Sequence, residues 1–307
     1  MKTLRGLVIR SQSGFYIVKT EQGAELQAQL RGRLKHGRAE GDIVALGDWV
    51  QVSEGGDGEP PMIEAVEERQ RALLRQAPGR GGNYEQVIVA NPDQVFFVFA
   101  CADPAPRFGM LDRFLVIAEQ QQLPAAIVVS KVDLLGKKQA KEMFGHYADI
   151  GYPVFYTSAN KGWGVKDLHK EMAGKITVLA GASGVGKTSL LNHIEPELGL
   201  RVAEVREKTR KGSHTTVERV MFPLQAGGYV ADTPGLKALA LSDIEPEELD
   251  GYFPEMAERV PQCKYRGCTH IQEPGCAILA AVEAGAVNFE RYQSYLNIRA
   301  KLEEALG

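Results

Sequence analysis

Residues 181–188 have the composition of a phosphate-binding loop. They read Gly181-Ala182-Ser183-Gly184-Val185-Gly186-Lys187-Thr188 and fit the pattern G-x-x-x-x-G-K-[ST]. Glycines let successive backbone N–H groups surround phosphate oxygens, and the N-terminus of a following helix favours an anion. We expect Lys187 to contact the terminal phosphates of a nucleotide and the Thr188 hydroxyl to coordinate Mg²⁺. An apolar run precedes the loop and a helical segment follows it, which is the context that such a loop requires.

A second element, Asp232-Thr233-Pro234-Gly235, follows the apolar run at 228–231. The pattern D-x-x-G at the end of a strand is typical of a segment that senses the γ-phosphate. We expect Asp232 to hold Mg²⁺ through a water molecule and the Gly235 N–H to contact the γ-phosphate. The pattern is weak alone, but together with the phosphate-binding loop it indicates a nucleoside triphosphate site.

A third element, Ser130-Lys131-Val132-Asp133, directly follows the apolar run at 125–129 and resembles the guanine-recognition pattern N-K-x-D. A carboxylate at Asp133 accepts hydrogen bonds from guanine N1–H and N2–H₂, whereas adenine presents an acceptor at N1. Adenine would leave the carboxylate buried and unpaired, which costs about 1–3 kcal/mol. We expect Lys131 to cover the base plane. Ser130 stands where asparagine is usual and weakens an expected contact.

The tetrapeptide Thr157-Ser158-Ala159-Asn160 follows the next expected strand and resembles the element S-A-[KN], whose backbone N–H meets guanine O6. We therefore place Ser158 and Ala159 in the nucleotide site. Both guanine elements precede the phosphate-binding loop here, whereas in conventional GTPases they follow it. The rotated order of all four elements predicts a circularly permuted GTPase.

The segment 201–216 lies between the phosphate-binding loop and the D-x-x-G element, in the position of a nucleotide-dependent switch. Thr216, or alternatively Thr215, would coordinate Mg²⁺ and close on the γ-phosphate. Leu236 stands where many GTPases carry a glutamine that orients the attacking water, so another polar group is needed. His214 is the candidate catalytic residue, although an ordinary loop histidine is an equal alternative. Five basic side chains in this segment would contact RNA phosphate or only solvent: Arg201, Arg206, Lys208, Arg210 and Lys211.

Three of the four cysteines lie close together near the C-terminus, in the pattern Cys263-x₄-Cys268-x-His270-x₅-Cys276. Three thiolates and one imidazole form a closed tetrahedral shell for a structural Zn²⁺, with no open coordination position for catalysis. The fourth cysteine, Cys101, ends an apolar run, and we expect it to be a small buried hydrophobe.

The elements that position these residues fall into three expected domains and a linker. Glycine-punctuated β segments in residues 1–70 predict an all-β OB-type barrel, a class that often binds single-stranded nucleic acid. The expected strands are 4–10, 15–20, 25–30, 43–52 and 62–67. A basic linker follows at 71–84. Alternating strands and helices in 85–243 predict an α/β P-loop domain, and 244–307 is expected to be mainly helical and zinc-binding.

Composition agrees with a multidomain globular protein. The chain has 307 residues, 44% hydrophobic and 24% charged, which suffices for a substantial core. The longest apolar runs, such as 95–102, are far shorter than the roughly 20 residues that span a bilayer. No signal peptide is expected. The net charge of −3 is no global signature of nucleic-acid binding, so any RNA contact must use a local patch.

Taken together, these motifs resemble the RsgA (YjeQ) family of bacterial GTPases that depend on the small ribosomal subunit. The resemblance covers nearly the whole chain. It implies GTP hydrolysis stimulated by the small subunit during late maturation, with contacts to its ribosomal RNA. It also assigns nucleotide contacts to 130–133 and to the phosphate-binding loop through Ser189, the zinc ligands to the Cys₃His set, and catalysis to His214. Ser130 and Val217 depart from the family pattern.

We therefore expect a cytoplasmic, monomeric GTPase that binds GTP or GDP, Mg²⁺ and one structural Zn²⁺, and that has no membrane partner. Two alternatives remain at this point. One is an rRNA-docking checkpoint in which the nucleotide state mainly sets the binding lifetime. The other is a P-loop ATPase or small-molecule kinase, which competition between GDP and ADP would distinguish.

Overall fold

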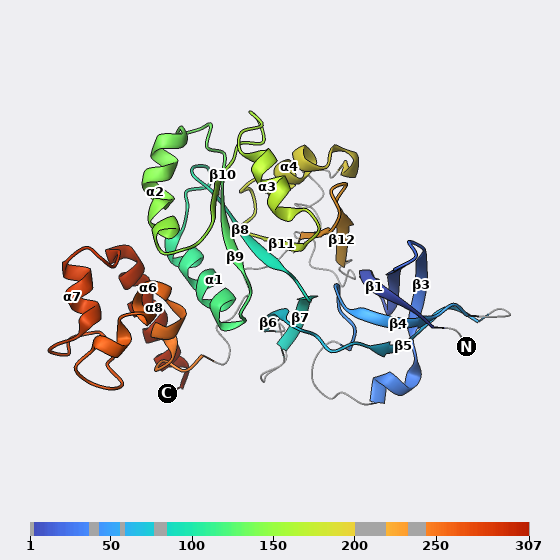
Figure 1. The fold of residues 1–307 in the computed structure, drawn as a ribbon, viewed down its shortest axis with the longest axis horizontal. Helices are drawn as coiled ribbons and strands as arrows, with labels where there is room; N and C mark the ends of the chain where they lie inside the picture. The colour runs from blue at the N-terminus through green and yellow to red at the C-terminus, as the bar shows by residue number, and fades with distance from the viewer. Residues whose placement is uncertain are drawn as a thin grey trace.

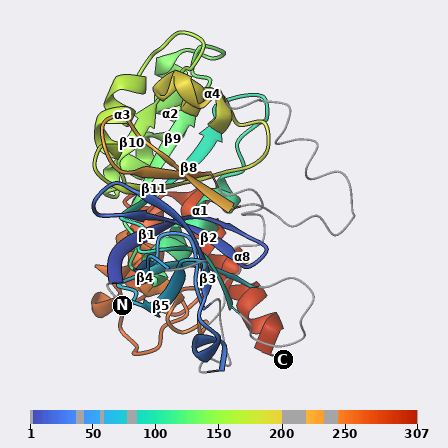
Figure 2. The ribbon, with the colours of Figure 1, turned by 90° about the vertical axis from the view of Figure 1, so that its right-hand side faces the viewer.

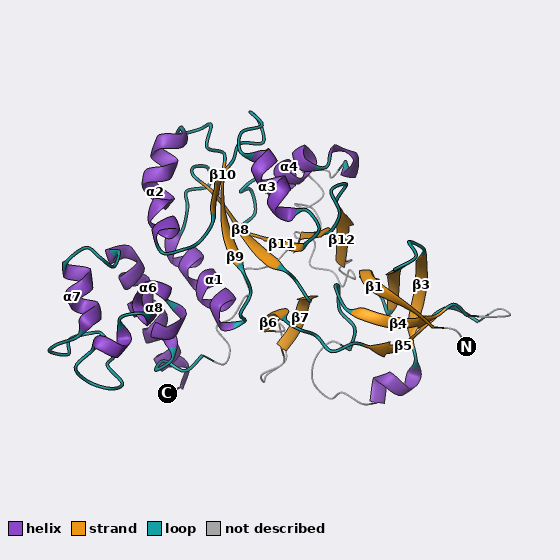
Figure 3. Cartoon of the chain, in the orientation of Figure 1, coloured by secondary structure: helices purple, strands orange, loops and turns teal. Residues whose placement is uncertain are grey.

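The computed structural model describes residues 3–36, 43–55, 59–76, 85–199, 219–232 and 244–306. Within them the chain forms a β-barrel, a central α/β domain and a C-terminal group of helices (Figures 1 and 3). The central domain lies between the other two, so both flanking domains contact it. Among these residues, no helix is both long and apolar enough to span a membrane.

The N-terminal domain confirms the predicted five-stranded barrel. Its strands are β1 (Thr3–Gln12), β2 (Phe15–Thr20), β3 (Glu25–Leu30), β4 (Trp49–Ser53) and β5 (Met62–Val66), with a 3₁₀ helix η1 (Gly32–His36). Strand β1 pairs with both β2 and β4, which closes the barrel. Its interior is filled by aliphatic side chains from alternate positions, including Val8, Val18 and Val50.

One predicted strand is shorter than expected, because β4 begins at Trp49 and not at residue 43. A turn precedes it in which Gly47 has a φ of +82° and the Asp48 carboxylate accepts the Ala45 N–H at 2.7 Å. A Cβ at Gly47 would lie 2.0 Å from the Ala90 carbonyl oxygen. Glycine is therefore required where the barrel meets the central domain.

The segment expected to be a basic linker contains a strand. Residues of β6 (Ala72–Gln76) pair in antiparallel fashion with β7 (Glu85–Ala90), and 77–84 lie outside the described residues. Arg69 also belongs to the folded structure, since its guanidinium contacts both oxygens of the fully buried Asp48 carboxylate at 2.8 Å. The chain between barrel and central domain is thus held at several points.

The central domain is a mainly parallel sheet with helices on both faces. In chain order its elements are β8 (Gln94–Ala100), α1 (Phe108–Gln120), β9 (Ala125–Ser130), α2 (Lys137–Asp149), β10 (Val154–Tyr156), α3 (Val165–Met172), β11 (Ile176–Ala180), α4 (Lys187–Ile194), η2 (Pro196–Leu198), β12 (Arg219–Pro223) and β13 (Tyr229–Asp232). The strand order is β10-β9-β8-β11-β13-β12. Every residue of β8 is buried, as the apolar run 95–102 suggested.

Side chains of β8 alternate between two cores. Phe97 and Phe99 pack with Phe114 on α1, whereas Phe96 and Val98 pack with α3 and α4 residues such as Leu168. This period of two is why a continuous apolar run forms a strand buried on both faces.

The sheet does not end at the central domain. After a bulge between Val8 and Arg10, β1 pairs with β12 through Arg10–Val220 and Ser11–Arg219, so one sheet of eleven strands runs through both domains. The turned view in Figure 2 shows the barrel strands below the central sheet. Backbone hydrogen bonds therefore join the barrel and the central domain into one continuous sheet.

The C-terminal domain is mainly helical, as predicted. It contains η4 (Leu249–Tyr252), α6 (Pro254–Ala257), η5 (Val260–Gln262), α7 (Ala277–Glu283) and α8 (Phe289–Leu306). Arg291 on α8 is 1% exposed and donates to Glu255 at 2.8 and 3.1 Å. It also donates to Asp112 on α1 at 2.9 Å, and Tyr147 on α2 donates to the same oxygen at 2.7 Å. This buried network joins the helices to the central domain.

We predict that Arg291→Met destabilises the protein, because the uncharged side chain leaves two buried carboxylates without their cation. The expected loss is about 3–5 kcal/mol, the usual cost of removing one partner of a buried ion pair. Urea unfolding followed by tryptophan fluorescence and circular dichroism measures it. Lys301→Met, an exposed change on the same helix, is the matched control. Equal unfolding midpoints for the two variants would contradict the prediction.

Candidate functional site

The turns after β9, β10 and β11 meet at one edge of the central sheet, because these strands run parallel to β8 and to one another. A pocket of about 230 Å³ opens there. Its lining combines the predicted guanine elements with the phosphate-binding loop: Asp103, Ser130, Lys131, Asp133, Leu134, Ala159, Asn160, Gly186, Ser189 and Leu190. Segments far apart in the sequence thus form one site.

The Asp133 carboxylate is suited to receive a base edge. Its Oδ1 atom is buried and has no hydrogen-bond partner among the described residues. Hydrogen bonding from Ser158, which outweighs burial, lowers the pKa of Asp133, so the group is an anion at neutral pH. A buried anionic oxygen without a donor is costly, and a donor edge such as that of guanine satisfies it.

Ser130 joins two turns of the site through its hydroxyl. Its hydroxyl is 2% exposed and lies 2.5 Å from the carbonyl oxygen of Val185, in the phosphate-binding loop. This bond joins the base-recognition turn to the phosphate-binding turn. Since the single hydroxyl proton is used there, Ser130 has no proton left to donate to the base.

The neighbouring turns hold the rest of the base pocket. Lys131 has a φ of +56° and its ammonium donates to the Asp103 carbonyl, which lays its aliphatic stem beside the pocket. The Val132 N–H donates to the Thr157 carbonyl at 3.1 Å. Ser158 is fully buried and exchanges two backbone hydrogen bonds with Trp163 at 3.0 and 3.1 Å. These bonds set the backbone of Ala159 at the pocket wall.

The phosphate-binding loop has the predicted form, with β11 before it and α4 after it. Gly186 precedes α4 with a φ of +98°, and a Cβ at Gly181 would lie 2.3 Å from the Val98 carbonyl oxygen. The Lys187 ammonium donates to the carbonyls of Gly181 and Ala182 at 2.8 and 3.1 Å. The lysine therefore spans the loop that would hold the phosphates. Thr188 occupies the second position of α4.

Of the residues predicted to sense the γ-phosphate, namely Asp232, Gly235 and Thr216 or Thr215, the structure describes only Asp232. The backbone of Asp232 ends β13 and pairs with Leu179, next to the phosphate-binding loop. Thr215, Thr216, Gly235 and Leu236 lie outside the described residues, as do His214, Val217 and the basic residues of 201–216. Their predicted roles stay predictions.

The predicted metal ligands come together in the C-terminal domain. One ligand atom from each of Cys263, Cys268, His270 and Cys276 lies within 4.8 Å of all the others. Cys263 Sγ is 4.0 Å from Cys276 Sγ and 3.7 Å from His270 Nδ1. Sulfur atoms bound tetrahedrally to zinc are about 3.8 Å apart, so the residues present fit a Zn²⁺ ion. Burial raises the pKa of the Cys268 thiol to about 12, so metal binding would release its proton.

The loop that carries these ligands is fixed from both sides. His270 has a φ of +59°, and its carbonyl accepts the Tyr292 hydroxyl at 2.7 Å from α8. The Glu273 carboxylate accepts the N–H groups of Thr269, Ile271 and Gln272 at 2.7–3.1 Å. Burial raises the pKa of Glu273, but donation by the Thr269 hydroxyl and by these N–H groups outweighs it and lowers the pKa to about 2. The loop is therefore preorganised for the metal.

Sequence reasoning missed the second partner of the metal-binding histidine. The Nε2 atom of His270 lies 2.9 Å from Asp250 Oδ2 on η4, while Nδ1 faces the cysteines. A carboxylate on the far ring nitrogen selects the tautomer that leaves Nδ1 free to ligate zinc. No spacing motif marks Asp250, since it lies on a separate element. Asp103, Leu134, Asn160 and Leu190 were likewise not assigned to the nucleotide site, although the last three adjoin predicted residues.

Comparison with known proteins agrees with this geometry. The family model described as RsgA GTPase matches residues 66–242, and that of the RsgA N-terminal domain matches residues 5–60. The small ribosomal subunit biogenesis GTPase RsgA of Gemmatimonas aurantiaca is 43% identical over 300 residues, and the protein of that name from Moorella thermoacetica is 40% identical over 299; each alignment covers 97% of both chains.

Two solved structures share the whole architecture. The crystal structure of YjeQ from Thermotoga maritima has a TM-score of 0.80 and 33% identity, with 98% of this chain and 99% of that chain covered. That of YloQ, described as a circularly permuted GTPase, has a TM-score of 0.76 and 31% identity, with 99% and 96% covered.

The rotated order of the nucleotide elements on an intact P-loop sheet defines the class of this protein as a circularly permuted GTPase. The barrel before that domain and the Cys₃His cluster after it narrow the class further. With matches over nearly its full length, the chain belongs to the RsgA GTPase family.

We predict that Asp250→Asn weakens zinc binding 10- to 100-fold, the usual effect of removing a carboxylate that orients a ligating histidine. Competition with a chromogenic chelator measures the zinc affinity of the full chain. Glu248→Gln, an exposed change just before η4, is the matched control. A zinc affinity unchanged by Asp250→Asn would show that this hydrogen bond does not support the metal site.

Proposed function

We propose that this protein binds the small ribosomal subunit and hydrolyses GTP to GDP and phosphate during late maturation of that subunit. The observation that carries the nucleotide part is the buried Asp133 oxygen without a donor, placed in a pocket beside the phosphate-binding loop. The partner follows from the similarity to RsgA proteins of that printed function over 97% of the chain.

The base preference follows from hydrogen-bond chemistry. Guanine would present N1–H and N2–H₂ to the Asp133 carboxylate, and O6 on the same edge of the base would accept from the Ala159 N–H. Adenine would direct its N1 lone pair at the carboxylate, which repels it. The same argument disfavours an ATPase or an ATP-dependent kinase.

The phosphates and Mg²⁺ would be held by groups from two strands. Backbone N–H groups of 181–188 and the N-terminus of α4 would face the phosphates, and Lys187 would exchange its loop carbonyls for phosphate oxygens. Thr188, Asp232 and Thr216 would hold Mg²⁺, which neutralises charge on the β- and γ-phosphates. Ser183 and Ser189 would complete the nucleotide contacts.

Hydrolysis needs a group that orients water, because the Leu236 side chain has no hydrogen-bonding atom. We assign this role to His214 in the segment that precedes β12. On this proposal the free protein turns over GTP slowly, and the small subunit orders the segment around the γ-phosphate. The basic residues of 201–216 would contact ribosomal RNA there.

We keep the predicted division into a barrel at 1–70, a connecting segment at 71–84, a GTPase domain at 85–243 and a zinc-binding domain at 244–307. The strand β6 makes the connecting segment part of the folded structure. On the proposed function, the protein acts as a monomer in the cytoplasm, where its ribosomal partner is assembled. A docking role in which nucleotide state sets the binding lifetime is compatible with the same site.

We predict that Asp133→Asn reverses the base preference. An asparagine amide donates to the 2-oxo group of xanthine but opposes the 2-amino group of guanine, so GDP affinity falls roughly 10- to 200-fold while xanthosine diphosphate affinity rises. Calorimetric titration with GDP, xanthosine diphosphate and ADP measures this, with Asp149→Asn on the exposed end of α2 as control. Equal binding of ADP and GDP by the unchanged protein would refute guanine recognition.

We predict that small ribosomal subunits accelerate GTP turnover and that His214→Ala removes roughly 10²-fold or more of the stimulated rate. Nucleotide affinity should stay unchanged, since His214 is not expected to contact the base or the phosphate-binding loop. Phosphate release with and without purified subunits measures the effect, and His193→Ala on α4 is a histidine control. Equal rates with and without subunits would refute partner-gated hydrolysis.

A further inference from the structure

The hairpin formed by β12 and β13 connects the two segments that are predicted to sense the nucleotide. Strand β12 begins at Arg219, shortly after the segment 201–216, and β13 ends at Asp232, where the D-x-x-G element begins. The backbone of Asp232 pairs with Leu179 on β11, two residues before the phosphate-binding loop. The position of this β12–β13 hairpin therefore decides where the D-x-x-G element lies relative to the bound phosphates.

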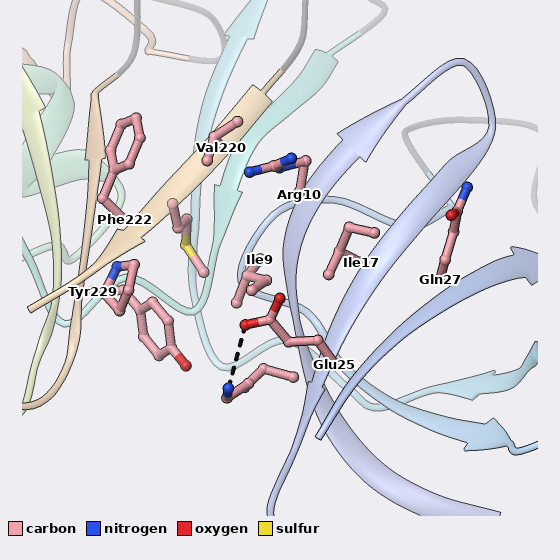
Figure 4. A pocket seen from close by; sticks show the side chains of 11 residues that line it. Ile9, Arg10, Ile17, Glu25, Gln27, Val220, Phe222 and Tyr229 are labelled. Atoms are coloured by element: carbon pink, nitrogen blue, oxygen red, sulfur yellow. Dashed lines mark hydrogen bonds and ion pairs between the residues drawn. The ribbon is translucent and has the colours of Figure 1, made fainter. Parts of the chain in front are cut away.

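The barrel supports the hairpin along a short stretch. Among the described residues, β1 pairs with β12 at two positions, Arg10 and Ser11. Beside these pairs lies a cavity of about 400 Å³ that the barrel and the GTPase domain share, with Phe222 and Tyr229 on the hairpin side (Figure 4). Side chains that face a cavity lack protein neighbours on that side. Contacts elsewhere must therefore fix the position of the hairpin.

The turn of the hairpin, residues 224–228, supplies such contacts. Leu224 is 5% exposed and belongs to the same apolar core as Ile194 on α4. The Gly174 N–H, in the turn between α3 and β11, donates to the Gly227 carbonyl at 2.9 Å. The turn is thus packed against the GTPase domain, whereas the strands of the hairpin face the cavity.

A further hydrogen bond at this turn uses a buried carboxylate. The Gln225 N–H donates to Glu195 Oε1 at 2.7 Å, and Glu195 is 3% exposed. Glu195 directly follows α4, where the helix dipole disfavours an anion and burial adds a desolvation cost. The His169 Nε2 atom is 3.7 Å from the same oxygen, which is beyond hydrogen-bond distance. A carboxylate kept in such an unfavourable position indicates a role other than filling space.

Helix α4 connects this hydrogen bond to the phosphate-binding loop. The helix begins at Lys187, within the loop, and Glu195 follows its last residue. A closed path therefore runs from the loop along α4 to Glu195, across to Gln225, and along β13 to Asp232, which lies beside the loop again. A slip of β13 by one residue would displace the backbone of Asp232 by about 3.3 Å along the strand. Fixing the turn against the end of α4 prevents that slip.

We propose that Glu195 is a positioning residue for the GTPase site, because its hydrogen bond with Gln225 holds β13 in the register that places the D-x-x-G element beside the phosphate-binding loop. The inference rests on the proposed function, since it takes GTP as the nucleotide that the site binds. It assigns to a residue at the far end of α4 an effect on the γ-phosphate. The base and the β-phosphate are held by other groups, so their binding does not depend on Glu195.

Calorimetric titration of the full chain with GDP and with a non-hydrolysable GTP analogue tests this role. Glu195→Ala should lower the affinity for the analogue about tenfold or more, a usual size for coupling between two sites, and leave the affinity for GDP unchanged. Glu195→Gln should restore analogue binding, because the amide oxygen accepts the same N–H. Glu197→Ala, an exposed change two residues further on, is the matched control. A merely structural role would lower both affinities alike.

A change on the hairpin side tests the same bond independently. Gln225→Pro removes the N–H, and Gln225 occupies the second position of the turn 224–227, where proline is favoured. This variant should lose analogue affinity as Glu195→Ala does. Combining the two changes should cost no more than either alone, because both remove one hydrogen bond. Gln225→Ala keeps the N–H and is the control.

The possible failures are distinguishable. The positioning role is overturned if Glu195→Ala or Gln225→Pro binds the analogue as its control does, or if GDP affinity falls together with analogue affinity. Should Glu195→Ala fail to fold, the comparison of Gln225→Pro with Gln225→Ala decides. If the unchanged protein binds neither GDP nor the GTP analogue, the proposed function itself fails.

Discussion

The nucleotide site depends on the parallel sheet that brings the carboxyl ends of β9, β10 and β11 to one edge. Three turns that are distant in sequence meet there, and the hydrogen bond from Ser130 to the Val185 carbonyl joins the base-recognition turn to the phosphate-binding turn. The fully buried β8 lies between them and supports both through its two faces. The distance between a base and its phosphates is fixed by the nucleotide, so the two turns must be held at a constant separation.

The second constraint is that backbone groups at exposed strand edges need hydrogen-bond partners. Strand β12 ends the central sheet and the second half of β1 extends beyond its pairing with β4, so each alone would expose unpaired backbone groups. Their pairing through Arg10–Val220 and Ser11–Arg219 covers part of both edges and couples the barrel to the β12–β13 hairpin. The bulge between Val8 and Arg10 redirects β1 from one partnership to the other. The same strand therefore closes a barrel and extends a sheet.

The permuted order also places the domain with the Cys₃His cluster directly after the D-x-x-G element. In this chain residues 236–243 connect the D-x-x-G element to that domain. The domain is anchored twice: within itself by the Cys₃His cluster and its Asp250 support, and to α1 by the buried Arg291–Asp112 pair. An ion pair with both side chains 1% exposed demands accurate geometry, so it favours one orientation of the helices against the GTPase domain.

The sequence by itself determined the nucleotide elements, the metal ligands, their permuted order and the class of each domain, because those features depend on residue type and spacing along a local stretch. It also predicted most strands, since alternation and glycine punctuation are local signals. It did not reveal Asp250, the Ser130–Val185 bond or the shortened β4, and it assigned β6 to a linker. Only the tertiary structure decided the pairing of β1 with β12, the shared cavity and the Arg291 network. Each of them depends on groups from distant segments of the chain, and a local sequence pattern does not indicate which distant surfaces will contact one another.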